Sequence, residues 1–405
     1  MLSSPPLAAP SLAAVLDPVI PRVTAWLGQR PDALSLAQGM VHWGPPDAVL
    51  QTLSAALQQA GTDPAAAASL HRYGPGAGDP PLLAAIADSL QRQHGLDLSA
   101  SDLWVTAGSN MAFQLVLRAL CDPGDAVIVP VPYYFNHVMA VQLAGAEPQL
   151  VDAGPVPDPQ RLEAAITPRT RAIISVSPNN PSGVVTPPEV LAEIGRLCAR
   201  RGLVHLCDEA YAAFTHGAVP HRSPGSAPGS GAHTVTLQSF SKAYGMAGWR
   251  LGYAAVPRQL REALLRIQDT LLICPPRPLQ RAAVAALEAG PEWLASRLAS
   301  LSPGRQALLE LPARLGRLGL EARLLAEPDG AFYGLLAVAC PLRGEELVRR
   351  LILEHGVAAL PGESFGLQPS PGQALLRLSY GMLRGPELEL ALERLGQGLL
   401  ALSRG

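Results

Sequence analysis

The sequence predicts an α/β protein with a mostly parallel, doubly wound sheet in a large domain and a smaller α+β domain beside it. Three observations support this prediction. The chain has 405 residues, of which 48% are apolar, enough to bury more than one core. From about residue 80, short apolar runs alternate with helical patterns, as in sheets covered by helices on both faces. Beyond about residue 290, the pattern changes to long arginine-bearing helices around a few strands.

The strands expected in the large domain are short and fully apolar, which is typical of strands buried on both faces. They span 103–106, 126–131, 172–176, 203–207, 234–237 and 251–255. Helices are expected between them, among others at 81–92, 111–120 and 188–201, and the last has a start signal in Thr186 followed by two prolines. In the small domain, strands are expected at 323–326, 331–338 and 375–380.

Two loops rich in proline and glycine interrupt this order, at 154–159 and 220–231. The second is of low complexity, and we expect it to be mobile.

The changes of pattern along the chain set the expected domain boundaries. Residues 1–45 form an N-terminal arm and part of the small domain, residues 46–288 form the large domain, and residues 289–405 form the small C-terminal domain.

Composition narrows the class of partner. The formal charge is only −2, with no run of like charges, so nothing favours nucleic acid or an anionic membrane. No apolar run is long enough to span a bilayer, and the proline-broken N-terminus lacks the basic region of a signal peptide. Five scattered cysteines without metal-type spacing indicate reduced thiols and no metal site. We therefore expect a cytoplasmic protein with small-molecule partners.

Polar side chains gather directly after the predicted strands, where ligands bind in open α/β sheets. After the first strand, Gly108-Ser109-Asn110 leads into a helix whose N-terminal N–H groups attract phosphate. Tyr134 follows the second strand with a ring able to stack on a flat ligand. Taken singly, each has a structural explanation too, because glycine turns connect elements and aromatic rings fill cores.

The next two strands end in further polar clusters. One runs from Ser177 through Asn180 to Gly183, and the other contains Asp208 and Tyr211. An aspartate in this position also caps helices, so Asp208 alone is ambiguous. The two clusters lie at the ends of predicted neighbouring strands and add to the candidate site.

Lys242 is the only lysine among the 31 basic residues, all others being arginine. Arginine stays protonated, whereas lysine can lose its proton and form an imine with an aldehyde. A covalent role would therefore forbid arginine at this position, whereas without such a role a bias toward arginine could have left one lysine by chance. Lys242 follows Ser239 and Ser241 and precedes Arg250, which places phosphate donors around an amine, as a phosphorylated aldehyde cofactor requires.

At these residues the chain resembles the class I and II aminotransferases of the pyridoxal-phosphate superfamily, which share the aspartate aminotransferase fold (fold type I). The resemblance extends over nearly the whole chain. Four motifs appear in family order: Asn180-Pro181-x-Gly183, Asp208-x-x-Tyr211, Ser239-x-Ser241-Lys242 with Arg250, and Arg377-x-Ser379-Tyr380-Gly381. The resemblance implies pyridoxal 5'-phosphate in the large domain and amino transfer from an L-amino acid to a 2-oxo acid.

The resemblance also implies roles for single residues. Lys242 matches the Schiff-base lysine, which is also the general acid and base, and Asp208 matches the carboxylate at the pyridine nitrogen. Tyr211 and Asn180 match the groups that bind the ring's phenolic oxygen. Arg377 matches the arginine that takes the substrate α-carboxylate, and Asn180 is expected to bind the substrate as well. The other matched residues are the phosphate ligands Ser109, Asn110, Ser239, Ser241 and Arg250, the stacking ring Tyr134, and Gly39 in the segment that covers the substrate.

Tyr73 matches a tyrosine that reaches the phosphate of the neighbouring subunit, so the resemblance implies a homodimer with shared sites. Five further residues either line the pocket or belong to the core: His42, Trp43, Tyr133, Tyr244 and Tyr333.

Substrate and reaction type remain open between alternatives. The apolar and aromatic segment 36–43 favours a neutral, aromatic or methionine-like side chain. Asn110 stands where some dicarboxylate-specific relatives have a lysine, and Arg277 is the remaining candidate cation for an aspartate-type enzyme. A β-eliminating carbon–sulfur lyase on the same fold is a further alternative. A regulator using this fold carries a DNA-binding domain ahead of it, for which we expect no room here.

Overall fold

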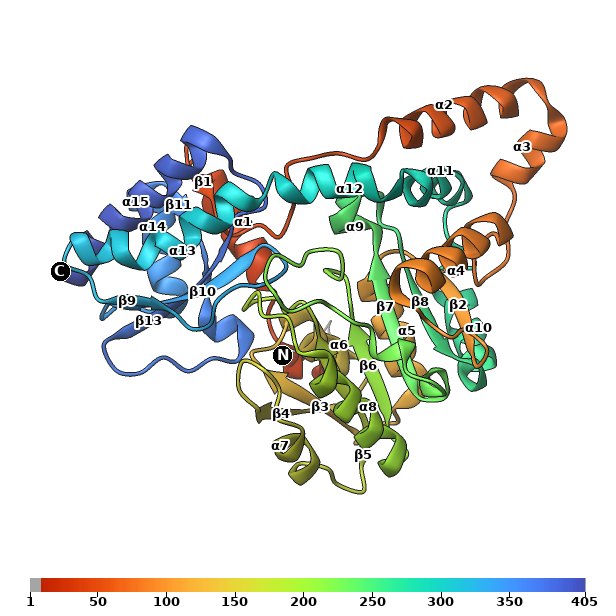
Figure 1. The fold of residues 1–405 in the computed structure, drawn as a ribbon, viewed down its shortest axis with the longest axis horizontal. Coiled ribbons are helices and arrows are strands. Elements are labelled where there is room, and N and C mark those ends of the chain that lie inside the picture. Colours follow the sequence, from red (N-terminus) through yellow and green to blue (C-terminus); the bar gives the residue numbers. More distant parts are fainter. Residues whose placement is uncertain (1–8, 405) are drawn as a thin grey trace, which may run out of the picture.

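The computed structural model describes residues 9–404, so the first eight residues of the predicted N-terminal arm lie outside it. A seven-stranded sheet in the order β2-β8-β7-β6-β5-β3-β4 forms the centre of the large domain (Figure 1). Neighbouring strands are parallel except at β8, which runs antiparallel to β2 and β7. The mostly parallel sheet is therefore confirmed. Its strands are β2 (Ser101–Thr106), β3 (Ala126–Val131), β4 (Glu147–Asp152), β5 (Thr170–Val176), β6 (Val204–Asp208), β7 (Thr234–Ser239) and β8 (Gly252–Pro257).

Helices cover both faces of this sheet, and adjacent strand residues serve opposite faces. Trp104 packs in the core with residues of α5, whereas Val105 packs in the core under α4 and α11. The helices on the α5 side are α5 (Ser109–Leu120), α6 (Phe135–Leu143) and α10 (Arg261–Leu271). Those on the other side are α4 (Pro80–His94), α7 (Pro159–Ala164), α8 (Pro188–Arg201) and α11 (Arg277–Glu288).

Two helices extend away from the body of the protein. α2 (Asp47–Thr62) packs on α11 and then leads into α3 (Pro64–His71), and Figure 1 shows the pair reaching outward beyond α11. The short α9 (Phe240–Ala243) follows β7 and carries Lys242.

The smaller domain joins both ends of the chain, as predicted. Its sheet has the order β12-β13-β10-β9 and is antiparallel throughout. β1 (Leu34–Ser35) pairs with β11 (Val357–Ala358), and α1 (Val19–Gly28) packs on α14. The remaining elements are β9 (Ala322–Leu324), β10 (Tyr333–Ala339), β12 (Leu360–Pro361), β13 (Gln373–Ser379), α12 (Gly290–Ala299), α13 (Ser302–Arg317), α14 (Gly344–His355) and α15 (Gly385–Arg404).

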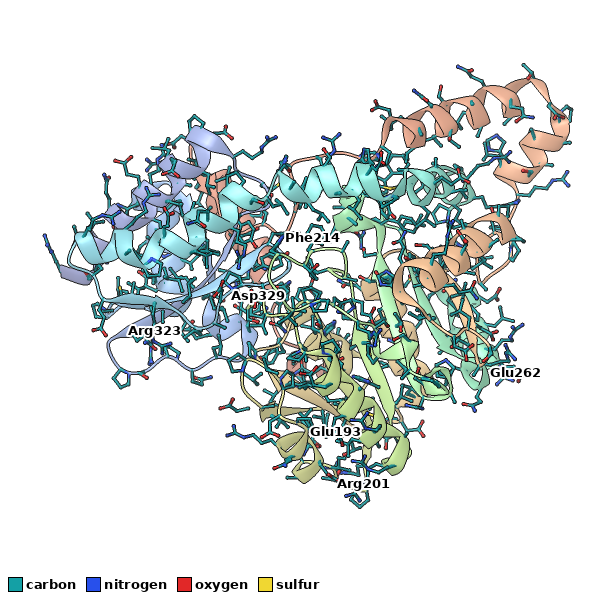
Figure 2. All side chains as sticks on the ribbon, in the orientation of Figure 1. Glu193, Arg201, Phe214, Glu262, Arg323 and Asp329 are labelled. Atoms are coloured by element: carbon teal, nitrogen blue, oxygen red, sulfur yellow. The ribbon has the colours of Figure 1, made fainter. Side chains whose placement is uncertain are left out.

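The two domains meet beside the carboxyl ends of the large sheet. Figure 2 labels Phe214 and Asp329 at this junction. The backbone N–H of Ala331 donates to the carbonyl of Phe214 at 2.9 Å, and Thr215 forms a β-bridge with Gly330. We propose the domain boundaries at 45/46 and 288/289, since α11 ends at Glu288 and α12 starts at Gly290.

One strand of the large domain was not predicted. The edge strand β4 was missed because its residues Glu147–Asp152 are all exposed or half-buried and form no apolar run. Segment 220–231 forms two short 3-10 turns, Pro224–Ser226 and Ser230–Ala232, and its mobility stays a prediction. Its residues Ser223, Pro224 and Gly225 are buried.

Within residues 9–404, no helix combines the length and the apolar character needed to cross a membrane. All five cysteines fall in this range, and each stands as a free thiol.

Candidate active site

The cavity at Lys242 collects side chains from five strand ends. The carboxyl ends of parallel strands share one edge of the sheet, so the loops after β2, β3, β5, β6 and β7 converge there. Every residue that the sequence assigned to the cofactor within one subunit lines this cavity, together with Val176 and Ala210: Ser109, Asn110, Tyr134, Asn180, Asp208, Tyr211, Ser239, Ser241, Lys242 and Arg250.

One end of the cavity is built to hold an anion. Ser109 begins α5, a helix of 12 residues, and the preceding Gly108 has φ +89°. A Cβ at Gly108 would collide with the guanidinium of Arg250, so glycine allows the cation to lie directly against this turn. Ser239 caps α9, with its Oγ accepting from the N–H of Ser241 at 3.1 Å. Hydroxyls, a helix N-terminus and an arginine together match the needs of a phosphate monoester.

Lys242 supplies the amine at the centre of the cavity. Its Nζ donates to the carbonyl of Gly39, which brings the N-terminal segment over the site. Burial and, to a lesser extent, the charges of Arg377 and Arg250 together lower the pKa of Lys242 to about 8, against the opposing effect of Asp208. A substantial fraction of the amine is therefore neutral near neutral pH and able to act as a nucleophile or base.

Asp208 is held by a partner that the sequence analysis missed. Its Oδ2 lies 2.9 Å from Nε2 of His137, and its Oδ1 accepts from the N–H of Ala210 at 3.0 Å. His137 is buried, on α6 one helical turn after Tyr134. That spacing from Tyr134 was the only local signal for it. The pair leaves Asp208 fixed at the wall of the cavity.

Arg377 lies next to this cavity as a buried cation without an anion. Its side chain is only 2% exposed, and no carboxylate within residues 9–404 forms a salt bridge with it. Nη1 donates to Oδ1 of Asn180 at 3.2 Å, Nη2 donates to the carbonyl of Ala37, and Nε has no partner among the described residues. An unpaired buried guanidinium is costly, and a ligand carboxylate would compensate it.

Two tyrosines complete the walls. Burial raises the pKa of Tyr134 to about 12 and raises that of Tyr211 well above its ordinary value, so both keep their protons at neutral pH. Tyr211 lies with its hydroxyl 2.7 Å from that of Tyr333. Five residues were assigned to either the pocket or the core from the sequence, and two of them contact the site. Tyr333 does so through Tyr211, and Trp43 does so through its Nε1, which donates to the carbonyl of Ala243 at 3.1 Å.

The donor set fits pyridoxal phosphate. It combines an anion cradle, an amine of lowered pKa, a carboxylate for a ring nitrogen, and hydroxyl and amide groups for a phenolic oxygen. Asn180 accepts from Arg377 through Oδ1, so its amide N–H groups remain to donate. No group of three or more His, Cys, Asp or Glu within residues 9–404 is placed to hold a metal ion.

Two predicted residues lie elsewhere in the chain. Tyr73 stands in the loop between α3 and α4 and is 78% exposed. Arg277 is close by, with Nη1 3.5 Å from the carbonyl of Arg72 and Nε 3.0 Å from Oδ1 of Asp79. Neither lines the cavity of its own chain, and the charge of Arg277 is already paired with Asp79.

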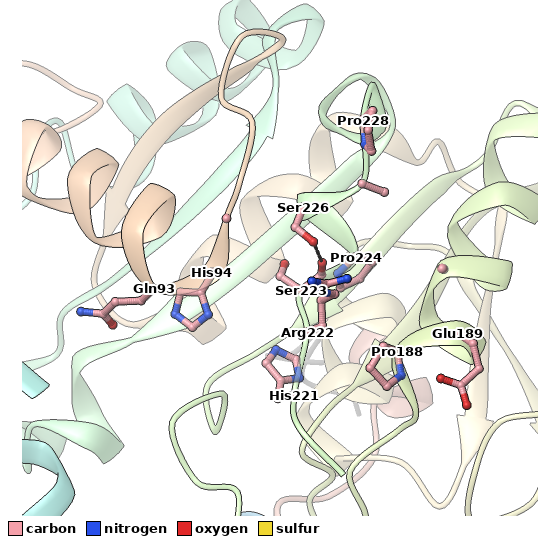
Figure 3. Close-up of a pocket in the computed structure, with 13 residues that line it drawn as sticks. Gln93, His94, Pro188, Glu189, His221, Arg222, Ser223, Pro224, Ser226 and Pro228 are labelled. Atoms are coloured by element: carbon pink, nitrogen blue, oxygen red, sulfur yellow. Dashed lines mark hydrogen bonds between the residues drawn. The ribbon is translucent and has the colours of Figure 1, made fainter.

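A larger cavity, about 770 Å³ against about 120 Å³ at Lys242, lies between the end of α4, the start of α8 and residues 221–228 (Figure 3). Beside it, the buried Glu209 accepts from Ser223 Oγ at 2.6 Å and contacts Nε2 of His221 at 3.2 Å. Glu209 follows Asp208 directly and points away from Lys242 because successive residues of an extended chain alternate. These contacts keep Ser223 buried and tie segment 220–231 to the strand end that presents Asp208.

Known proteins with similar sequences and structures agree on one family. The family model for aminotransferase class I and II matches residues 32–395. An aromatic aminotransferase of Arabidopsis thaliana is 34% identical, covering 94% of this chain and 93% of the relative. A probable aspartate/prephenate aminotransferase of Thermus aquaticus is 35% identical, covering 91% and 92%. A single mutant of Thermus thermophilus aspartate aminotransferase superposes with a TM-score of 0.85 at 32% identity, covering 97% and 99%.

Proposed function

The chain belongs to the class I and II aminotransferases, and we propose that it transfers the amino group of a neutral or aromatic L-amino acid to a 2-oxo acid at Lys242. Amino transfer with pyridoxal phosphate is the activity of this family and of this chain. The roles of single residues, the substrate class and the dimer are the proposed parts.

The observation that carries the proposal is the unpaired Arg377 beside the amine of Lys242. A planar guanidinium binds a carboxylate through two parallel hydrogen bonds, and both substrates of amino transfer carry such a carboxylate. Bound to Arg377, the substrate Cα is brought toward Lys242. Nη2 of Arg377 now donates to the carbonyl of Ala37, and the substrate carboxylate would replace this acceptor.

Pyridoxal phosphate, when bound, supplies an aldehyde that condenses with amines and a protonated ring that accepts the electrons released at the substrate Cα. The protein supplies the rest. Ser109, Ser239, Ser241 and Arg250 hold the phosphate, and Asp208 keeps the ring nitrogen protonated. Tyr211 and Asn180 donate to the phenolic oxygen, while Tyr134 covers one face of the ring.

Lys242 has two tasks in this proposal. It would hold the cofactor covalently between turnovers, and its free amine would take the proton from the substrate Cα and deliver it to the cofactor carbon that carried the aldehyde. The lowered pKa of Lys242 suits both tasks, because an amine of pKa about 8 is a base close to working pH. The segment with Gly39 and Trp43 lies over the site and limits the access of water.

The substrate class follows from the charge around the site. Arg277, the candidate for a distal carboxylate, is paired with Asp79, and both side chains are mostly buried. The side chains that contact the site from the small domain and the covering segment, Tyr333 and Trp43, are aromatic and buried. Relatives named aromatic and aspartate/prephenate aminotransferases are about equally similar to this chain, and the charge argument supports our choice of the neutral class.

A substrate panel tests this choice. We expect kcat/KM for aspartate to fall about 10²-fold below that for phenylalanine or methionine, since a buried carboxylate without a cation costs about 3 kcal/mol. Steady-state rates with each donor and several 2-oxo acids measure it. The matched variant Asp79→Asn removes the salt bridge to Arg277. Its ratio of kcat/KM between phenylalanine and aspartate should therefore be smaller than that of the wild type. A wild-type preference for aspartate would contradict the neutral class.

We also propose a homodimer with shared sites. Large apolar side chains are exposed on α2 (Leu50 and Leu57), in the loop between α3 and α4 (Tyr73) and on α10 (Leu265 and Leu271). Exposed apolar side chains of this size favour a protein partner where they form one surface. A second copy on this surface would bring Tyr73 to the partner's phosphate.

The five free cysteines fit a reducing compartment, for which we propose the cytoplasm.

Complementation tests the shared site. Lys242→Ala removes the amine and Tyr73→Ala removes the crossing ring, so each parent is expected to be nearly inactive or strongly impaired. Mixed dimers contain one site with intact Lys242 and Tyr73, and random re-association restores about a quarter of all sites in a two-fold dimer. Activity of the re-associated mixture measures it. If mass analysis finds mixed dimers but activity stays at the parental average, Tyr73 acts within its own chain.

A further inference from the structure

Tyr333 connects three parts of the site that come from distant segments. It is fully buried at the start of β10 in the small domain. Its hydroxyl lies 2.7 Å from that of Tyr211, and the Arg377 Cζ lies 4.5 Å from the centre of its ring. A Cβ at Gly39 would collide with the Tyr333 hydroxyl, so the covering segment approaches this side chain as closely as glycine allows.

The direction of the hydrogen bond between the two hydroxyls follows from their proton count. Burial raises the pKa of both phenols, so each brings one proton at neutral pH. Tyr211 needs its own proton to donate to the phenolic oxygen of a bound cofactor. It must then accept from Tyr333, and a hydroxyl that accepts one hydrogen bond becomes a stronger donor in the next.

We propose that Tyr333 is a positioning residue of the amino-transfer reaction, directing the Tyr211 proton toward the cofactor's phenolic oxygen while its ring supports the Arg377 guanidinium. This inference rests on the proposed function, because it takes the roles of Tyr211 and Arg377 from it. The hydroxyl and the ring have separate effects. The hydroxyl sets the electronic state of the bound cofactor, and the ring sets the affinity for the substrate carboxylate.

The pH dependence of the visible absorbance separates this role from a merely structural one. In the Tyr333→Phe holoenzyme, Tyr211 donates more weakly, the phenolic oxygen becomes more basic, and the pKa of the absorbance change moves upward. We expect a shift of about 0.3 to 1 unit, the share of one neutral hydrogen bond. KM for the amino acid should stay nearly unchanged, because phenylalanine retains the ring over Arg377.

A double-mutant cycle shows whether the effect passes through Tyr211. Tyr211→Phe alone should shift the same pKa upward by more, and adding Tyr333→Phe to it should produce no further shift. Tyr380→Phe is the matched control, since its buried hydroxyl donates to the carbonyl of Ala331 at 3.4 Å outside the cavity. That variant should leave the pKa of the absorbance where it is in the wild type.

Three outcomes would overturn the inference. They are no shift in Tyr333→Phe, an equal shift with and without the Tyr211 hydroxyl, and an equal shift in Tyr380→Phe. If Tyr211→Phe itself causes no shift, its assigned role fails and the inference falls with it. A holoenzyme whose visible absorbance does not depend on Lys242 would instead refute the proposed function, so the two failures are distinguishable.

Discussion

We expect a Lys242→Arg variant to bind pyridoxal phosphate without any covalent link and to lose activity by at least about 10⁴-fold, the upper range for a general acid and base. Arginine keeps the positive charge but cannot lose its proton to attack an aldehyde. Borohydride reduction followed by denaturation and mass analysis measures the link. The cofactor should stay on the wild-type chain, at Lys242, and wash off the variant.

Because the chain has a single lysine, a second lysine on the surface is a suitable control for the specificity of labelling. Arg266→Lys adds a second lysine on the exposed surface of α10, where the native side chain is 81% exposed. That added amine should remain unlabelled while Lys242 is labelled. The rate of covalent capture by the apoenzyme should rise as the pH passes about 8, since only the neutral amine reacts. Retained turnover in Lys242→Arg would refute the assignment.

The second large effect is expected at Asp208. Asp208→Asn keeps the shape but removes the charge that faces both His137 and the ring nitrogen. Breaking a buried charge pair costs about 3–5 kcal/mol, which corresponds to about 10²–10⁴-fold in cofactor affinity or rate. Titration of the apoenzyme with cofactor and single-turnover rates with an amino acid measure the two losses.

Glu209→Gln is the matched control for Asp208→Asn. Glu209 is the adjacent buried carboxylate, but it faces Ser223 and His221 on the reverse side of the strand end. Its loss should lower thermal stability while the absorbance of bound cofactor stays as in the wild type. Should Asp208→Asn keep near-normal single-turnover rates, another group must pair with the ring nitrogen.

Much of the fold and site could be predicted because the relevant signals are local. β3 and α8 match their predicted spans, since uninterrupted apolar runs and a proline at a helix start depend on neighbouring residues alone. The site residues follow strand ends, and parallel topology places all those ends at one edge. The order of strands along the chain therefore predicted which side chains line the cavity.

The features that could not be predicted depend on tertiary contacts instead of local sequence patterns. β4 is an edge strand without an apolar run. The burial of Ser223 in segment 220–231 was not predicted, because it depends on a hydrogen bond from Ser223 Oγ to Glu209, 14 positions earlier in the chain. His137 has no motif of its own, and only the packing of α6 brings it to Asp208.

By itself, the sequence determined the fold class, the family and the identity of the reactive amine, because a lone lysine in a strand-end motif is a property of order and composition. Tertiary structure decided what those residues meet. It left Arg377 without an anion while placing it against Ala37, 340 positions earlier in the chain, and against Asn180. It paired Arg277 with Asp79, turned Tyr73 outward and joined Tyr333 to Tyr211. Such contacts join segments far apart in sequence, so no local pattern of residues encodes them, and they form only when the two domains pack together.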